Sequence, residues 1–361
     1  SQIVHQYDPT KKSVEKPEKP TETIVEKPIV AEVKPTEPLK IVEEKPKEIG
    51  KIWYPFAAFG SENVPTQKDY IIRNATVWTN TAKGIVKNYD VKISKGKIVE
   101  VGTQLSKGNA EEIDGTNLHL TNGIIDEHTH IGLSRGVNEA GSNSSAEVRM
   151  SDVINPDDVN FYRQIVGGVT TAQQLHGSAN PIGGRAAFIK LKWGYAPDEM
   201  LVKDAPKYIK FALGENVKQS NWGDFSRNRF PQSRMGVEQV YEDYFTRAIE
   251  YKNEWNAYKS GKNKKMPRFD IEMEVLGEIL AKKRFITCHS YVQSEINMLM
   301  KLAERYGFKI QTFTHILEGY KLADKMSAHG VAGSTFADWW AYKYEVNDAI
   351  PYNAAIMMNE G

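Results

Sequence analysis

The sequence predicts an α/β protein whose main part is a (β/α)8-type TIM barrel with seven strands present and the eighth missing. From residue 124 onward, apolar segments with strand propensity alternate with amphipathic segments at helical spacing, which is typical of parallel βαβ units. Six further strand segments follow the first one, and this number favours a barrel over a short open sheet. A small antiparallel β-sandwich portion and a disordered N-terminal linker are expected before the barrel.

Residues 1–51 form the first predicted domain, a linker built mainly from Pro, Lys, Glu, Val and Thr. The segment has few aromatic residues and its charges alternate in sign, so it cannot bury enough apolar surface to offset its ordering entropy. We expect an extended, mobile spacer. Recognition of its prolines by a partner protein is the alternative.

Residues 52–122 form the second predicted domain, a small β-sandwich portion. The segments 70–78 and 89–93 are rich in β-formers, and residues 92–101 are expected to form a hairpin that turns at Gly96. We expect these segments to pair as an antiparallel unit ahead of the barrel.

Residues 123–361 form the third predicted domain, the barrel. Strands are expected at 124–130, 169–175, 186–192, 208–214, 285–290, 310–315 and 331–336. Helices are expected at 156–166, 237–259, 271–283, 294–306, 319–328 and 352–360.

Composition excludes several classes of protein and site. The net charge of +1 over 361 residues gives no reason to expect nucleic acid or an anionic membrane as the main partner. The single cysteine, Cys288, excludes an internal disulfide and a cysteine zinc site. No apolar stretch is long enough to span a bilayer.

The first barrel strand carries a metal-binding pattern. Asp126, His128 and His130 alternate along the segment, so in a strand their side chains share one face. Two neutral imidazoles one strand step apart can bind the same cation. The alternative is a strand with two partly exposed histidines.

Two more histidines, His289 and His315, end later strand segments. The carboxyl ends of barrel strands converge on one face, where active sites lie. The sequence therefore predicts that four histidines from three strands meet at one rim of the barrel. Core packing is a poor explanation for four histidines in such positions.

The other histidines have simpler explanations. His176 follows a strand on the same face, where it contacts substrate or supports its loop. His5 belongs to the linker and His119 to a short β segment. His329 precedes Gly330 at the expected end of a helix.

These motifs resemble the metal-dependent amidohydrolase superfamily, which carries an Asp-Glu-His-Thr-His strand followed by single histidines on two later strands. The stretches Asn-Pro-Ile-Gly-Gly, Gly-Glu-Asn-Val-Lys, Arg-Phe-Pro-Gln-Ser-Arg-Met-Gly-Val and Thr-His-Ile-Leu-Glu-Gly resemble a bacterial branch near imidazolonepropionase-like and prolidase-like enzymes. The resemblance covers residues 53–361. It implies one or two divalent cations, with zinc expected first and manganese or iron as alternatives.

By this resemblance, His128 and His130 hold the first metal, and His289 and His315 hold the second. The resemblance also implies a bridging ligand from the fourth strand, for which two residues compete. Lys210 matches a lysine that prolidase-like relatives carbamylate, whereas Glu215 could bridge directly.

We favour Lys210, because a lysine inside a strand is costly to bury without such a role. Asp126 is expected to orient a ligand histidine without binding the metal itself.

The chain departs from the family pattern at its end. The resemblance implies a general-base aspartate at the end of an eighth strand, which would follow Gly361. Asp338 is the one candidate to replace it, although it follows the wrong strand and precedes two tryptophans.

An open barrel exposes strand edges and apolar surface. We therefore expect a longer polypeptide, or completion by another subunit, and weak stability for the isolated chain. Its start at Ser1 also suggests processing or a fragment.

The predicted activity is metal-dependent hydrolysis of C–N bonds in amides, cyclic amides or small peptides. Arg229 and Arg234 either clamp a substrate carboxylate or hold their long loop by salt bridges. Tyr291 either donates a hydrogen bond to a substrate oxygen or packs in the core. The alternatives are a deaminase with the same site geometry and a non-catalytic scaffold or binding subunit tethered by the linker. The spacer and scarcity of cysteine suggest an extracytoplasmic, periplasmic or secreted bacterial protein.

Overall fold

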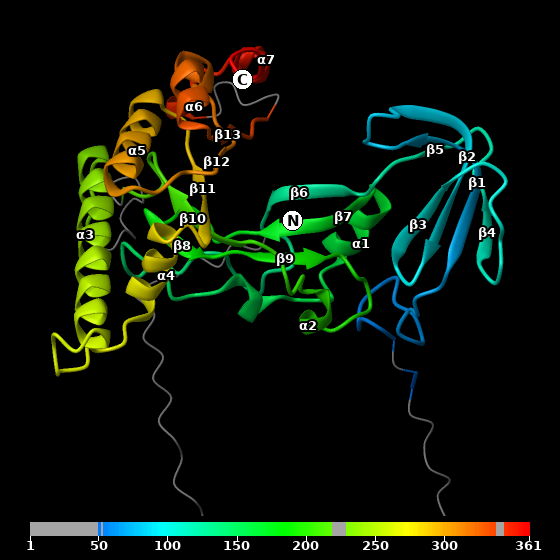
Figure 1. Cartoon of the computed structure of the whole chain (residues 1–361), viewed down its shortest axis with the longest axis horizontal. Coiled ribbons are helices and arrows are strands. Elements are labelled where there is room, and N and C mark those ends of the chain that lie inside the picture. The colour runs from blue at the N-terminus through cyan, green and yellow to red at the C-terminus, as the bar shows by residue number, and fades with distance from the viewer. Residues whose placement is uncertain (1–49, 52, 219–228, 337–342) are drawn as a thin grey trace, which may run out of the picture. The chain divides into compact units, whose positions relative to one another are not determined.

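The computed structural model describes residues 50–51, 53–218, 229–336 and 343–361 (Figure 1). The chain divides into two units, Ser1–Gly50 and Lys51–Gly361. The expected linker therefore lies almost entirely outside the described residues, and the described helices and strands all belong to the second unit. Within the described residues, no helix combines the length and apolarity needed to cross a membrane.

The N-terminal β region is one five-stranded sheet. Its strands are β1 (Tyr70–Trp78), β2 (Ile85–Ser94), β3 (Lys97–Gly102), β4 (Glu111–Asp114) and β5 (His119–Leu120). The order is β3-β2-β1-β4, with β5 also paired to β1. The predicted hairpin is present: β2 and β3 are joined by Lys95 and Gly96, whose φ angles of 51° and 73° suit a two-residue turn.

This sheet differs from the antiparallel expectation. The strands β4 and β5 both run parallel to β1. The chain after β3 crosses to the far side of β1 rather than turning back beside β3, so the pairing there is parallel. Ala75, Val77 and Val91 form its buried centre.

All seven predicted barrel segments contain a strand, but they fall into two sheets. One sheet joins β6 (Ile124–Thr129), β7 (Val169–Gln174) and β9 (Ala187–Lys190). The second has the order β13-β12-β11-β10-β8. Its strands are β8 (Ile182–Arg185), β10 (Lys207–Ala212), β11 (Arg284–His289), β12 (Thr312–Thr314) and β13 (Ala332–Gly333).

The expectation of an all-parallel, continuous barrel is not met in the described residues. The strand β9 runs antiparallel to β7, and β8, which was not predicted, runs antiparallel to β10. Parallel neighbours need a long crossover, usually through a helix. Residues 175–186 contain no helix, so the chain returns antiparallel to β7. The parallel pairs β6/β7, β10/β11, β11/β12 and β12/β13 are as predicted.

The predicted helices are present with small changes at their ends. They are α1 (Val159–Val166), α3 (Arg234–Lys259), α4 (Ile271–Leu280), α5 (Gln293–Tyr306), α6 (Ala323–His329) and α7 (Asn353–Asn359). The short helix α2 (Pro197–Met200) was not predicted. The side chains of Asp158, Ser233 and Asp270 cap the N-termini of α1, α3 and α4. Left-handed Gly307 and Gly330 end α5 and α6.

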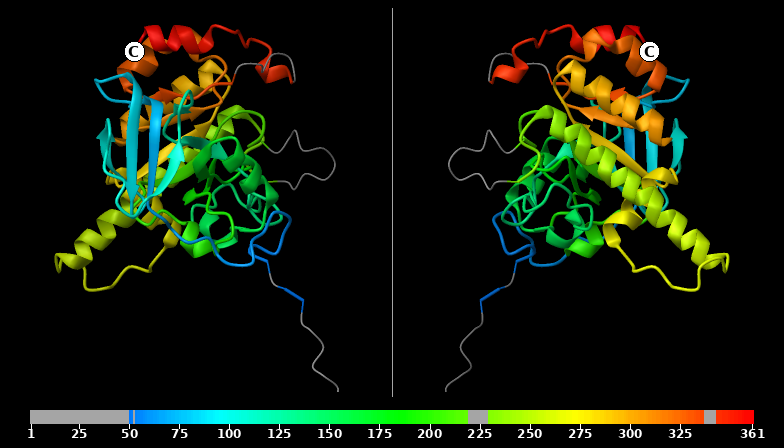
Figure 2. Two further views of the ribbon diagram at one scale, coloured as in Figure 1. Left: turned by 90° about the vertical axis from the view of Figure 1, so that its right-hand side faces the viewer. Right: turned by 90° about the vertical axis from the view of Figure 1, so that its left-hand side faces the viewer.

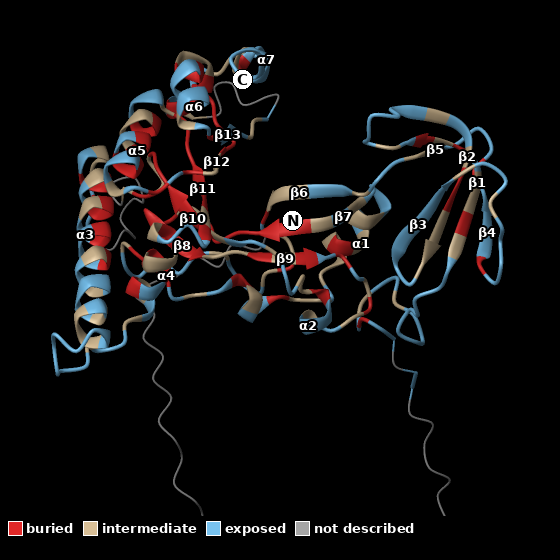
Figure 3. Cartoon of the chain, viewed as in Figure 1, coloured by how far each residue is buried: buried red, intermediate tan, exposed pale blue. Residues whose placement is uncertain are grey.

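The main apolar core lies between the sheet β13-β12-β11-β10-β8 and the helices that pack against it. The long helix α3 crosses the outside of this sheet (Figure 2). Buried residues concentrate along β10 and β11 and on the inner faces of α3 and α5 (Figure 3). This packing fixes β10, β11 and β12, and with them the residues at their carboxyl ends.

The edges of β6 and β13 are open within the described residues. The strand β6 pairs with β7 alone, and β13 pairs with β12 alone. Ile124 and Ile125 on β6 are 55% and 63% exposed. These are the edges that an eighth strand would join in a barrel. That further chain or another subunit covers them stays a prediction.

Candidate metal centre

His128 and His130 form a close pair of imidazole rings. Both lie at the end of β6, where the pairing with β7 shifts register between Asp126 and Thr129. Their Nε2 atoms are 3.2 Å apart. The Nδ1 atom of His130 donates to the carbonyl oxygen of Leu175 at 2.8 Å, so its Nε2 atom keeps a free lone pair.

The separation of this pair fits two ligands of one cation. With metal–nitrogen distances of about 2.0–2.1 Å and ligand angles near 90–110°, two imidazole nitrogens lie about 2.9–3.4 Å apart. The observed 3.2 Å falls within this interval. Two neutral imidazoles can share at most one hydrogen bond, so one divalent cation satisfies both lone pairs better.

His289 and His315 extend the pair into a row of four rings. The ring centroids of His128 and His315 are 5.3 Å apart, and those of His315 and His289 are 4.3 Å apart. The Nε2 atom of His289 is buried and has no hydrogen-bond partner among the described residues. An orphaned buried nitrogen is costly, and a cation would satisfy it.

The backbone at His315 is unusual. This residue follows β12 with a φ angle of 43°, in the left-handed region that a β-carbon disfavours. Strain of this kind is common at functional sites, where the surrounding structure holds a residue in an uncommon conformation. Here it turns the end of β12 so that His315 lies beside His289.

Lys210 is the buried cation of the site. It lies in β10, has no exposed surface, and its Nζ atom is 3.3 Å from Nε2 of His128. Burial lowers its pKa from 10.5 to about 8, because the charged ammonium loses its water. Glu215, the competing bridging residue, has its carboxylate 3.5 Å from Lys343. Of the two predicted bridging residues, Lys210 contacts His128 and Glu215 forms an ion pair with Lys343.

The four histidines are neutral, which is the form that binds metals. Burial is the main cause in each case, and it lowers the pKa of His130 to about 4 and that of His315 to about 3. The pKa values of His128 and His289 are also lowered, with the positive charge of Lys210 contributing to both. His130 is the most exposed of the four, and its shift is correspondingly smaller.

Glu127 and Thr314 also lie at the site, although the sequence pattern did not indicate them. The hydroxyl of Thr314 donates to Glu127 Oε1 at 3.1 Å, and its oxygen lies 2.8 Å from Nδ1 of His128. Ser334 also donates to Glu127. Since Thr314 uses its proton on the carboxylate, Nδ1 of His128 donates to Thr314, and Nε2 keeps its lone pair.

Strict alternation would place Glu127 away from His128. The register shift in β6 is the local irregularity that the sequence pattern does not reveal. Asp126, predicted to orient a histidine ring, instead accepts a hydrogen bond from the backbone nitrogen of His128.

The predicted substrate contacts fall into two groups. Tyr291 lies at the site, with its ring 4.6 Å from that of His289 and 4.9 Å from that of His315. The buried His176 accepts from the backbone nitrogen of Glu139 at 2.8 Å and donates to the carbonyl of Gly177, which are contacts of loop support.

Both predicted arginine clamps are engaged by the protein. Arg229 donates to the carbonyl oxygen of Ala179 at 2.9 Å. Arg234 makes ion pairs with the buried carboxylates of Glu295 and Glu345. Asp338, the alternative general base, lies outside the described residues.

Within the described ranges, no group of three or more His, Cys, Asp or Glu side chains converges as a complete metal-binding set. The structure shows one close imidazole pair, with two further imidazoles and a buried lysine beside it. The donor chemistry fits a divalent cation. The ligand sphere is incomplete in the observed side-chain positions.

Comparison with known proteins gives two informative similarities, and no family model matches the chain. An amidohydrolase, tasK of Hapsidospora irregularis, is 26% identical over 341 residues, covering 81% of this chain and 34% of that protein. The chain thus spans about a third of the length of this curated relative. A solved amidohydrolase from Thermotoga maritima MSB8 is 30% identical, with a TM-score of 0.74 over 81% of this chain and 76% of that one.

Proposed function

Because this chain belongs to the amidohydrolase superfamily, we propose that it hydrolyses C–N bonds in amides, cyclic amides or small peptides. The main observation in support is the 3.2 Å separation of the Nε2 atoms of His128 and His130. A hydrogen bond from its Nδ1 atom orients each imidazole. This arrangement supports a divalent cation shared by the two residues. His289 and His315 are the proposed ligands of a second cation.

Lys210 is the proposed source of a bridging ligand. A neutral lysine amine adds carbon dioxide and releases one proton, which leaves a carbamate whose single negative charge is shared by two oxygens. The lowered pKa of Lys210, about 8, increases the neutral fraction that this addition requires. A carboxylate group there would also place a negative charge among imidazoles and remove a buried ammonium.

When bound, a divalent cation lowers the pKa of a water ligand from about 15.7 towards ~7 and polarises a carbonyl oxygen. The residues of the chain supply the rest of the site. Thr314 and Glu127 hold the tautomer of His128. The hydroxyl of Tyr291 is our proposed hydrogen-bond donor to a substrate oxygen. Asp338, the candidate general base within the sequence, lies outside the described residues.

Metal content and product analysis together test this proposal. We expect purified protein to hold about one or two equivalents of zinc, manganese or iron. A screen of dipeptides, N-acyl amino acids and cyclic ureides should then reveal hydrolysis that His128→Asn abolishes. His119→Asn is the matched control, because His119 lies in the N-terminal sheet and bonds to Trp78.

The outcomes separate the remaining candidates. Release of ammonia from an amino-substituted heterocycle, without amide cleavage, would identify a deaminase instead. Purified protein that binds none of the three metals would support a non-catalytic scaffold. Zinc as the native metal and an extracytoplasmic location are further parts of the proposal, and elemental analysis and fractionation of the source cell test them.

A further inference from the structure

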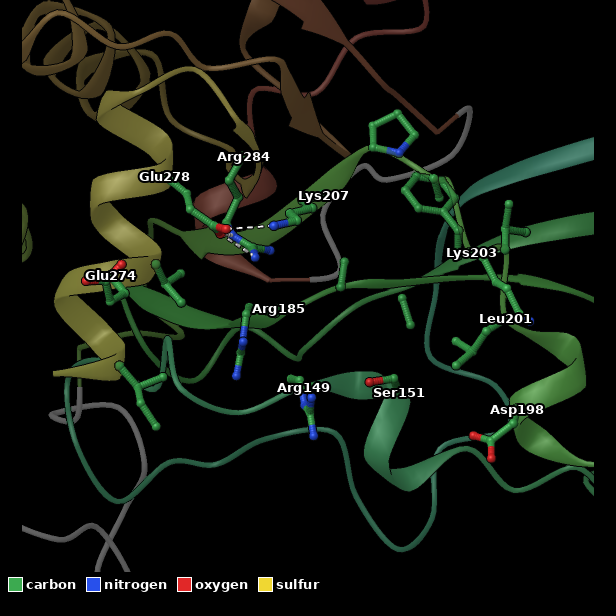
Figure 4. A pocket seen from close by; sticks show the side chains of 18 of the residues that line it. Arg149, Ser151, Arg185, Asp198, Leu201, Lys203, Lys207, Glu274, Glu278 and Arg284 are labelled. Atoms are coloured by element: carbon green, nitrogen blue, oxygen red, sulfur yellow. Dashed lines mark hydrogen bonds and ion pairs between the residues drawn. The ribbon is translucent and has the colours of Figure 1, made fainter. Parts of the chain in front are cut away.

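A cavity of about 670 Å³ lies where β10 and β11 begin, beside Lys207 and Arg284 (Figure 4). The strand β11 begins with Arg284 beside this cavity and ends with His289 at the metal centre. Its six residues span about 17 Å. The cavity is therefore separate from the proposed metal centre, and its size is typical of small-molecule sites.

Positively charged side chains outnumber negatively charged ones around this cavity. Its basic residues are Arg149, Arg185, Lys203, Lys207 and Arg284, and its acidic residues are Asp198, Glu274 and Glu278. Most of these charges are already compensated. Lys207 and Arg284 share the carboxylate of Glu278 at 2.7 Å each, and Arg149 pairs with Asp152 at 2.9 Å.

Arg185 and Lys203 form no ion pair within the described residues, and Arg185 projects into the middle of the cavity (Figure 4). Its Nη2 atom donates to the carbonyl oxygen of Glu147. Its Nε atom is buried and has no hydrogen-bond partner among the described residues. Burial lowers the pKa of this guanidinium, and the positive charges of Arg284 and Arg149 lower it further. An anion bound at this guanidinium would offset the repulsion from Arg284 and Arg149.

Apart from Ser151, the remaining wall of the cavity is apolar. Phe188 lies in β9, and Leu201 and Val202 follow α2. Phe269 and Ile271, at the start of α4, are 63% and 48% exposed. Apolar walls around one unsatisfied guanidinium suit a ligand with an anionic head and an apolar body.

We propose that this cavity binds a small carboxylate with an apolar body, its carboxylate on Arg185 and its body against Phe188 and Leu201. A planar guanidinium binds a carboxylate through two parallel hydrogen bonds, which fixes the head group. The exposed Lys203 at the rim adds attraction for the same charge. The site does not depend on the proposed hydrolase activity.

The test measures binding of 3-phenylpropanoate to the full chain by isothermal titration calorimetry. We expect saturable binding that is equal in metal-loaded and chelator-treated protein. Arg185→Gln should weaken binding at least tenfold, and Lys203→Gln should weaken it by a smaller factor. Lys190→Gln, which removes an exposed cation of β9 outside the cavity, should leave binding unchanged.

Three further probes separate charge from apolar contact. The neutral 3-phenylpropanamide should not bind, and acetate and inorganic phosphate should bind at least tenfold more weakly than 3-phenylpropanoate. The proposal is overturned if the wild-type protein shows no saturation up to about 10 mM probe, a concentration that detects even weak sites. It is also overturned if the amide or phosphate binds as well as 3-phenylpropanoate. Lys203 is exposed, so Lys203→Gln keeps the test valid even if Arg185→Gln fails to fold.

Discussion

The hydroxyl oxygen of Thr314 lies 2.8 Å from Nδ1 of His128. This contact joins the first histidine-bearing strand to a strand 186 residues later in the sequence. Through it, the carboxylate of Glu127 fixes which nitrogen of His128 carries the proton. The proposed ligand atom, Nε2, is thereby oriented before any cation arrives.

Removing this hydroxyl should weaken metal binding without unfolding the protein. For Thr314→Val we expect a loss of about 10- to 100-fold in zinc affinity, the usual effect of removing the partner of a ligand histidine. Competition with a chromophoric chelator measures it. Thr312→Val, the same change two residues earlier on β12, is the control. Equal affinities for both variants would show that Thr314 does not orient the ligand.

Replacing Lys210 should separate its electrostatic cost from its proposed role. Methionine fills a similar volume without charge, so Lys210→Met should leave the free energy of unfolding of metal-free protein unchanged or raise it. The same variant should lose a proposed bridging ligand, and with it at least one equivalent of metal and the hydrolytic activity. Urea unfolding and elemental analysis give the two readouts.

Glu215→Gln is the matched comparison for Lys210→Met, because Glu215 is the competing bridging residue and pairs with Lys343. We expect it to retain the metal. Loss of metal from Glu215→Gln together with retention by Lys210→Met would assign the bridge to Glu215.

Arg234 is expected to act on stability rather than on substrate affinity. Its guanidinium pairs with Glu295 and Glu345, whose side chains are 5% and 1% exposed. Arg234→Gln removes the cation paired with Glu295 and leaves Glu345 with Lys343 alone, and should lower the free energy of unfolding by about 2 kcal/mol. Arg305→Gln breaks the more exposed pair with Glu242 and should cost less than about 1 kcal/mol. A raised KM with unchanged stability would instead make Arg234 a substrate clamp.

Asp90 should make the N-terminal sheet sensitive to acid. Burial acts to raise the pKa of this carboxyl, but hydrogen bonds from the backbone of Asn74, the Arg73 guanidinium and the backbone of Leu105 lower it overall. Its stabilising contribution is therefore complete above the unfolded pKa of about 3.9, and is lost as the pH falls through the lower folded value.

The substitution Asp90→Asn removes that contribution. We expect the free energy of unfolding at pH 7 to fall by about 2 kcal/mol, and the difference from wild type to shrink below about pH 4. Chemical denaturation between pH 3 and pH 7 measures both effects. Glu111→Gln, on the exposed strand β4 of the same sheet, should change stability little. A difference that stays constant across this range would argue against a lowered pKa at Asp90.

Local sequence was enough to place most elements of the fold, but not β8 or α2. Apolar runs located the seven predicted strands, and helical spacing located α3, α4 and α5 close to their observed ends. The hairpin at Gly96 and the left-handed Gly330 were readable because turns and helix ends demand particular residues. Pairing direction was not readable in the same way. The antiparallel return of β9 depends on how residues 175–186 pack.

The candidate metal ligands could be recognised from the sequence alone, because imidazole is a good ligand for divalent cations and four histidines lie at strand ends. These are His128, His130, His289 and His315. Tertiary structure alone decided how they are held. The register shift in β6 brings Glu127 to Thr314, and Lys210 reaches His128 across separate sheets. Such contacts join residues far apart in the chain, and their geometry is set by the packing of whole strands, which no local pattern encodes.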